Sequence, residues 1–155
     1  MNNLGVTAQQ IMKRDLTAVM PDDTIEDAIQ VLTSHMISGV PVIDSAWRIV
    51  GYLSEIDILR SAMPSYIEIL AQDTFLYHEH EVLIEKFAGI RNRPVSEYMQ
   101  NQYHSVQTTS NILNAADIIL RYRLRRLPVL EGQILAGIID RTDLCRYLMK
   151  ADVSA

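Results

Sequence analysis

The sequence has one cysteine, few aromatic residues and no long apolar run. The single Cys145 cannot form an internal disulfide. No stretch approaches the run of about eighteen apolar residues that a membrane span needs, so we expect no membrane insertion. The first residues also lack the basic start and the apolar centre of a secretory signal. These absences predict a cytoplasmic protein.

The chain also lacks an excess of positive charge. Its net charge of −5 opposes general binding to nucleic acid, because such binding depends on neutralising many phosphates at once. A local anion site remains compatible with that charge. The 48% apolar and 21% charged residues are typical of a globular protein. A chain of 155 residues can form one ordinary core or two small units that share one, but not a catalytic domain plus a regulator.

The residue patterns of enzymes are missing too. No nucleophile stands beside a base, and there is no Gly-rich phosphate loop. His78 and His80 would lie on different faces of a helix, because a shared face needs a spacing of three or four, and this argues against a metal site. Cys145 has no histidine near it in sequence and is expected to be a small buried apolar residue. We therefore expect neither catalysis nor a metal cofactor.

An internal repeat organises the chain. Segment 38–44 (SGVPVID) is echoed 87 residues later by segment 125–131 (RRLPVLE). The same offset pairs Met12 with Met99, Val19 with Val106, Ile25 with Ile112 and Ala28 with Ala115. Further on the offset drops to 86 and aligns segment 51–57 (GYLSEID) with 137–143 (GIIDRTD). The lost residue falls where a hairpin turn can absorb it.

Each repeat predicts a helix, a β-hairpin and a second helix. Apolar residues recur at helical spacing in the first helix of each repeat, at Ile25, Ala28, Ile29 and Leu32, and at Ile112, Ala115, Ala116 and Ile119. Asp23 and Glu26 form a candidate capping box for the first of these helices. Strands are expected at 40–43, 49–53, 127–130 and 134–139. The second helices begin near Ser54 and Asp140 and carry Ile56, Leu59, Leu144, Tyr147 and Leu148.

These elements predict an α/β protein of the α+β type, with two βαββα repeats at 6–62 and 94–150. Such a small sheet cannot bury both faces alone, so the repeats should pack sheet against sheet with pseudo-two-fold symmetry and two related clefts. Residues 63–93 form a helical insertion, with one helix from Pro64 and a second after Asp73. The second carries an apolar stripe at Leu76, His80, Leu83, Phe87 and Ile90. That stripe packs either on its own domain or against a dimer partner.

The order and duplication of these motifs resemble the tandem CBS domain family, the cystathionine β-synthase type pair also called a Bateman module. The resemblance rests on the G-V-P-V and R-L-P-V segments, the G-h-h-S-x-x-D and G-h-h-D-x-x-D segments, and the starts at Met12 and Met99. It implies an adenosine compound in a cleft between the repeats: AMP first, with ADP, ATP or S-adenosylmethionine as alternatives. It also implies a homodimer that regulates an enzyme or transporter.

The resemblance implies that Asp57 and Asp143 hold the ribose of that ligand. A carboxylate can accept a hydrogen bond from each of two neighbouring hydroxyls, and charge-assisted bonds are the strong ones. The alternative needs no ligand, because Ser54 with Asp57, and Asp140 with Asp143, also have the spacing of helix caps.

Only the second repeat supplies a phosphate-binding arginine at the family's position. This is Arg126, and the first repeat has Gly39 there. The cluster Arg121, Arg123, Arg125 and Arg126 predicts either anion recognition or a solvated helix end. Asp140 departs from the Ser or Thr that is usual in the family and would repel a phosphate, so Thr142 is expected to supply the hydroxyl.

By family geometry the Asp143 site takes its adenine contacts near Leu16 and Thr17. The other site places Ser54 and Asp57 opposite Tyr103 and His104, where cationic groups are few. We therefore expect a phosphorylated ligand at the Asp143 site. The competing hypothesis is a ligand-free structural or dimerisation module in which the acidic residues only cap helices.

Overall fold

The computed structural model describes residues 5–63 and 75–151, and within them no helix is both long and apolar enough to cross a membrane. The chain divides into two compact units. Unit 1 comprises Met1–Thr17, Ile43–Val50 and Gln102–Ala155, and unit 2 comprises Ala18–Val42 and Gly51–Asn101.

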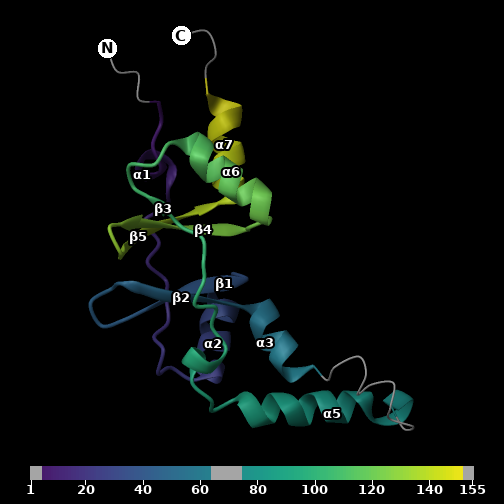
Figure 1. Cartoon of the computed structure of the whole chain (residues 1–155). Helices are drawn as coiled ribbons and strands as arrows, with labels where there is room; N and C mark the ends of the chain where they lie inside the picture. The colour runs from purple at the N-terminus through teal and green to yellow at the C-terminus, as the bar shows by residue number, and fades with distance from the viewer. Residues whose placement is uncertain (1–4, 64–74, 152–155) are drawn as a thin grey trace. The chain divides into compact units, whose positions relative to one another are not determined.

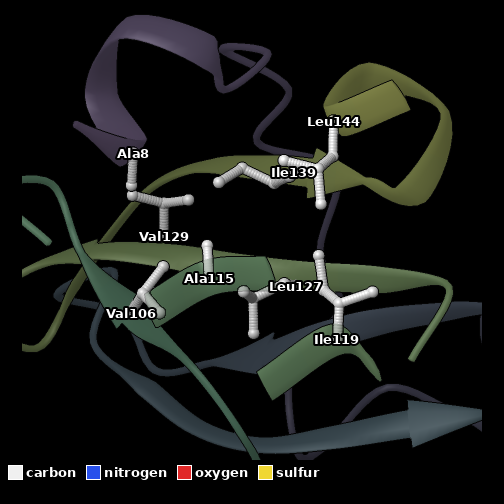
Figure 2. Packing of buried hydrophobic residues seen from close by; sticks show 8 residues of the cluster. All are labelled: Ala8, Val106, Ala115, Ile119, Leu127, Val129, Ile139 and Leu144. Carbon is white, nitrogen blue, oxygen red and sulfur yellow. The ribbon is translucent and has the colours of Figure 1, made fainter. Parts of the chain in front are cut away.

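Unit 1 is built on a three-stranded sheet in the order β3-β4-β5 (Figure 1). Strand β3 (Val106–Gln107) runs parallel to β4 (Arg126–Glu131), which pairs antiparallel with β5 (Ile134–Asp140). Helices α1 (Ala8–Ile11), α6 (Ile112–Tyr122) and α7 (Arg141–Lys150) pack on these strands. Figure 2 shows the core they share, formed by Ala8, Val106, Ala115, Ile119, Leu127, Val129, Ile139 and Leu144.

Unit 2 is built on the hairpin of β1 (Gly39–Ile43) and β2 (Ile49–Ser54). Helices α2 (Ile25–His35), α3 (Glu55–Ala62) and α5 (Phe75–Ile90) and the short 3₁₀ helix η1 (Val95–Glu97) complete it. The strands of β1 and β2 agree with those predicted from the sequence, and so do the starts of α3 after Ser54 and of α7 after Asp140.

The sequence repeat is reproduced in the backbone. Val19 forms a parallel bridge with Val42, and 87 residues later Val106 pairs in parallel with Val129. Helices α2 and α6 both end on a residue in the left-handed region, Met36 with φ 53° and Arg123 with φ 54°. The mixed α+β fold and its tandem repeats, predicted from the sequence, are therefore confirmed.

The segment that precedes each repeat's first helix belongs to the compact unit of the other repeat. Within unit 1, the backbones of Lys13 and Ile138 exchange hydrogen bonds of 2.8 and 2.9 Å. Within unit 2, Gln100 and Tyr52 exchange bonds of 2.8 and 3.0 Å in the same way. The compact units and the sequence repeats are thus different divisions of the chain, and each unit combines residues of both repeats.

Three local predictions were wrong. The cap of α2 is Thr24, whose hydroxyl accepts from Asp27 N, so the capping box is Thr24 with Asp27 and not Asp23 with Glu26. Asp23 instead accepts a hydrogen bond from Met20 N in the preceding turn. Cys145 is exposed, because α7 turns Asp143 and Leu144 inward.

The apolar residues of the second helices also divide differently from the pattern expected. In α3, Ile56 and Leu59 are about half exposed, while Ile58 and Ala62 are buried. In α7, Leu144 is buried and Leu148 is exposed.

Helix α5 corresponds to the second helix predicted in the insertion, while the one expected from Pro64 lies outside the described residues. Its residues Leu83 and Phe87 line an apolar pocket of about 480 Å³ with Ile25 and Ile29 of α2. This part of the stripe packs on its own unit.

Candidate functional site

A buried arginine forms the centre of the candidate site in unit 1. Arg126 begins β4, and its side chain is only 8% exposed. Its Nη1 donates to Asp140 Oδ1 at 3.1 Å, and its Nη2 lies 3.4 Å from Asp15 Oδ2. Its Nε has no hydrogen-bond partner among the described residues. The arginine expected to bind phosphate is therefore held between two carboxylates, with one buried donor left unused.

Lys13 reaches the same carboxylates from the first repeat. Its Nζ lies 3.0 Å from Asp140 Oδ2 and 3.3 Å from Asp143 Oδ1. The hydrogen bond to Asp140 and the charges of the two acids outweigh desolvation and raise the pKa of Lys13 above 10.5. Sequence analysis did not single out Lys13. The repeat alignment offered one signal, since it places this lysine opposite Gln100.

Asp143 is buried at the first turn of α7. Its Oδ2 accepts the backbone N–H of Asp140 at 3.0 Å, which is one half of the predicted capping box. Its Oδ1 faces Lys13 and lies 3.8 Å from Arg146 Nη1. Capping therefore occupies one carboxylate oxygen, and the other is held by cations that a ligand could displace.

The segment expected to contact adenine lies against this cluster. Asp15 Oδ1 accepts hydrogen bonds from the N–H of Thr17 at 2.9 Å and its hydroxyl at 2.6 Å. Burial alone would raise the pKa of Asp15, but the bonds from Thr17 and the Arg126 guanidinium outweigh it and hold that pKa below 3.8. Asp15 thus ties the Thr17 turn to Arg126. Leu16 and Thr142 are exposed.

The equivalent positions in unit 2 carry fewer charges. Asp57 Oδ2 accepts from both the N–H and the hydroxyl of Ser54, each at 2.9 Å, and its Oδ1 accepts from Gln100 Nε2 at 2.8 Å. In place of Arg126 this unit has Gly39, and a Cβ there would lie 2.7 Å from the ring of Tyr52. A tyrosine therefore covers the position from which the second repeat extends a guanidinium.

Two predicted site residues belong to the other unit. Tyr103 donates its hydroxyl to the carbonyl of Ile49 at 3.2 Å. His104 stacks on Tyr122 with the ring centroids 3.8 Å apart. Both lie in unit 1, while Ser54 and Asp57 lie in unit 2, so their opposition across a cleft stays a prediction.

The arginine cluster separates into two kinds of residue. Arg121 forms an exposed i,i+4 ion pair with Asp117, and Arg123 is the exposed C-cap of α6. These two fit the solvated helix end that was one of the two interpretations. Arg126 alone of the four turns into the cluster with Asp140.

The two units also differ in net charge. Unit 1 has ten Lys and Arg against seven Asp and Glu, a net +3, and unit 2 has four against twelve, a net −8. An anionic ligand is therefore attracted to unit 1 and repelled by unit 2.

Comparison with known proteins identifies the repeat. The family model described as "CBS domain" matches residues 8–63 and 95–150. CBSX2, a chloroplastic CBS domain-containing protein of Arabidopsis thaliana, is 31% identical over 96% of this chain, which spans 66% of that relative's length. A crystal structure of CBSX2 in complex with AMP matches with a TM-score of 0.71 at 28% identity, over 94% of this chain and 98% of that one.

The same module also occurs inside larger proteins. An A-adding tRNA nucleotidyltransferase of Geobacter sulfurreducens is 30% identical over 92% of this chain, which covers 13% of that enzyme. Similar pairs are therefore found both in CBS domain-containing proteins such as CBSX2 and as a minor part of an enzyme.

Proposed function

This chain belongs to the CBS domain family, and we propose that it is a regulatory module that binds an adenine nucleotide, with AMP as the first candidate, and signals its presence to a partner enzyme or transporter. One observation carries the proposal. In unit 1, Arg126 and Asp143 of the second repeat meet Lys13, Asp15 and Thr17 of the first. Both repeats thus contribute to one cluster.

Each group has a role in the proposed complex. Asp143 accepts the ribose hydroxyls, Arg126 and Lys13 bind the phosphate, and Thr142 adds a hydroxyl at the start of α7. Leu16 and Thr17 contact the adenine. The AMP complex of CBSX2, at 28% identity, supports the choice of ligand.

The ion pairs of the cluster supply a mechanism for signalling. A phosphate that approaches Arg126 competes with Asp15 and Asp140 for the same guanidinium. Because Asp15 also holds the Thr17 turn and Asp140 caps α7, a change of partner at Arg126 shifts both elements. Ligand binding then selects between two arrangements of the same ion pairs.

Calorimetric titration of the full chain tests the proposal. AMP, ADP, ATP and S-adenosylmethionine are titrated in turn, and at least one should bind with a micromolar Kd, roughly −8 kcal/mol. Asp143→Ala should weaken binding at least tenfold, whereas Asp57→Ala should do less. Equal losses would contradict the assignment to the Asp143 site, and absence of heat with all four ligands would refute nucleotide sensing.

A second candidate is a ligand-free dimerisation module. It is favoured by the cluster itself, because Lys13 and Arg126 already have carboxylate partners. Here no nucleotide would change the melting temperature, while Asp57→Asn would lower it by weakening the cap of α3. Light scattering would measure the homodimer that both candidates predict.

A further inference from the structure

Lys13 and Gln100 occupy equivalent positions, 87 residues apart, in the two repeats. Each precedes the first strand of its repeat, pairs its backbone with the last strand of the other, and turns its side chain to the candidate ribose carboxylate there. Lys13 Nζ lies 3.3 Å from Asp143 Oδ1, and Gln100 Nε2 lies 2.8 Å from Asp57 Oδ1. One carboxylate is thus held by a cation and the other by a neutral amide.

We infer that Lys13 makes the Asp143 site selective for phosphorylated adenosine over the uncharged nucleoside. This inference rests on the proposed nucleotide binding and adds the residue that sets its specificity. Lys13 occupies an oxygen that the ribose needs, and a phosphate gives the displaced ammonium a new anionic partner.

The argument follows from the charges that are exchanged. A ribose hydroxyl that bonds to Asp143 Oδ1 must displace the Lys13 ammonium. An uncharged nucleoside offers that ammonium nothing in return, so the lost ion pair opposes binding. A nucleotide replaces it with a lysine–phosphate pair. The Lys13 side chain is 48% exposed and therefore has room to swing outward.

The buried guanidinium supports a phosphate beside this lysine. Arg126 retains a buried Nε with no hydrogen-bond partner among the residues that the structure describes. Unit 2 has neither cation, since Gln100 and Gly39 stand at these positions. There a ligand would displace only an amide, and a phosphate would gain nothing.

The experiment compares AMP with adenosine by calorimetry on the full chain. The test variant is Lys13→Gln, which copies the residue of the other repeat, and Lys13→Arg is the conservative rescue. Arg14→Gln is the matched control, because it removes one exposed cation from the adjacent position. Each titration is run at low and high salt, and circular dichroism confirms that every variant is folded.

The wild-type chain should bind AMP at least tenfold more tightly than adenosine. Lys13→Gln should weaken AMP at least tenfold, leave adenosine unchanged or tighter, and reduce the salt dependence of AMP binding. Lys13→Arg should restore most of the preference, and Arg14→Gln should stay within threefold of wild type.

Two outcomes overturn the inference and are distinguishable. If Lys13→Gln keeps the wild-type ratio of AMP to adenosine affinity, nucleotide binding stands but Lys13 does not set the selectivity. If neither compound binds the wild-type chain and no other adenine nucleotide does, the proposed function fails and the inference fails with it. Should Lys13→Gln not fold, Lys13→Arg and Arg14→Gln still decide, since loss of selectivity in both would refute a role specific to Lys13.

Discussion

Gly137 lies directly against the segment that carries Lys13, and a Cβ added at Gly137 would be 2.7 Å from Met12 Sδ. The same position also meets the carbonyl oxygen of Lys13. In unit 2, a Cβ at Gly51 would lie 2.8 Å from Met99 Sδ and 2.9 Å from the carbonyl oxygen of Gln100. The glycine of each G-h-h-S/D segment is therefore required for a close approach of the other repeat's leading segment.

Gly137→Ala and Gly51→Ala should each destabilise the protein by about 1–3 kcal/mol, because a methyl group overpacks a backbone contact that cannot move aside. Urea unfolding followed by circular dichroism measures the loss. Gly89→Ala is the control, since nothing lies within 4 Å of its added Cβ in α5 and alanine favours helix. Wild-type stability of Gly137→Ala would contradict the close approach.

Replacing the left-handed residues at the ends of α2 and α6 should stabilise the protein. Met36 and Arg123 have positive φ, which costs a residue with a Cβ about 1 kcal/mol relative to glycine. Met36 is 92% exposed, so Met36→Gly loses almost no packing. We expect its free energy of unfolding to rise by about 0.5–1 kcal/mol in urea titrations.

Met36→Ala provides the matched comparison for that gain. It removes the same side chain but keeps the Cβ, so it should leave the free energy of unfolding close to that of wild type. A gain of the same size for alanine and glycine would show that the backbone angle is not its source.

The repeat and its hairpins were predictable because their signals are local. Turn residues and alternating apolar residues specify each hairpin within about fifteen positions, and an offset of 87 is visible in the sequence itself. The cap of α2 was missed by one position because Asp23 and Thr24 are both good capping residues. Only the backbone geometry distinguishes them.

The contacts of the candidate site were less predictable. Arg126, Asp140 and Asp143 could be proposed from the family pattern, but the ion pair of Lys13 with Asp140 spans 127 residues. No local pattern encodes such a pair. It depends on the leading segment of one repeat crossing to the sheet of the other.

The depressed pKa of Asp15 makes its contribution to stability depend on pH. Hydrogen bonds from Thr17 and the charge of Arg126 outweigh the effect of burial and lower that pKa below 3.8. The stabilisation is therefore complete above the unfolded value near 3.8 and is lost as the pH falls through the lower folded value. Asp15→Asn should be less stable than wild type at pH 6, and this difference should shrink below pH 4.

Urea unfolding from pH 7 to pH 3, with NMR titration of the Asp15 carboxyl, measures both quantities. Asp22→Asn is the control, since it removes an exposed carboxylate from the same chain. A difference between wild type and Asp15→Asn that stays constant down to pH 3 would contradict the lowered pKa.

The ion pair of Arg126 with Asp140 should show strong energetic coupling, because neither side chain is well solvated. Arg126 is 8% exposed and Asp140 is 19% exposed, at an N···O distance of 3.1 Å. A double-mutant cycle of Arg126→Met and Asp140→Asn should give a coupling free energy of about 1–2 kcal/mol in urea unfolding. Arg126→Met alone should be the worst of the variants, because it also leaves Asp15 without its cation.

The exposed pair of Arg121 with Asp117 is the matched comparison. Its N···O distance is 3.0 Å, so it equals the buried pair in geometry, but its side chains are 62% and 55% exposed. Solvent screening should therefore make its coupling much smaller. Equal coupling in the two cycles would mean that Arg126 is bound no more tightly than a surface residue, and that a phosphate could take it from Asp140 without rearranging the site.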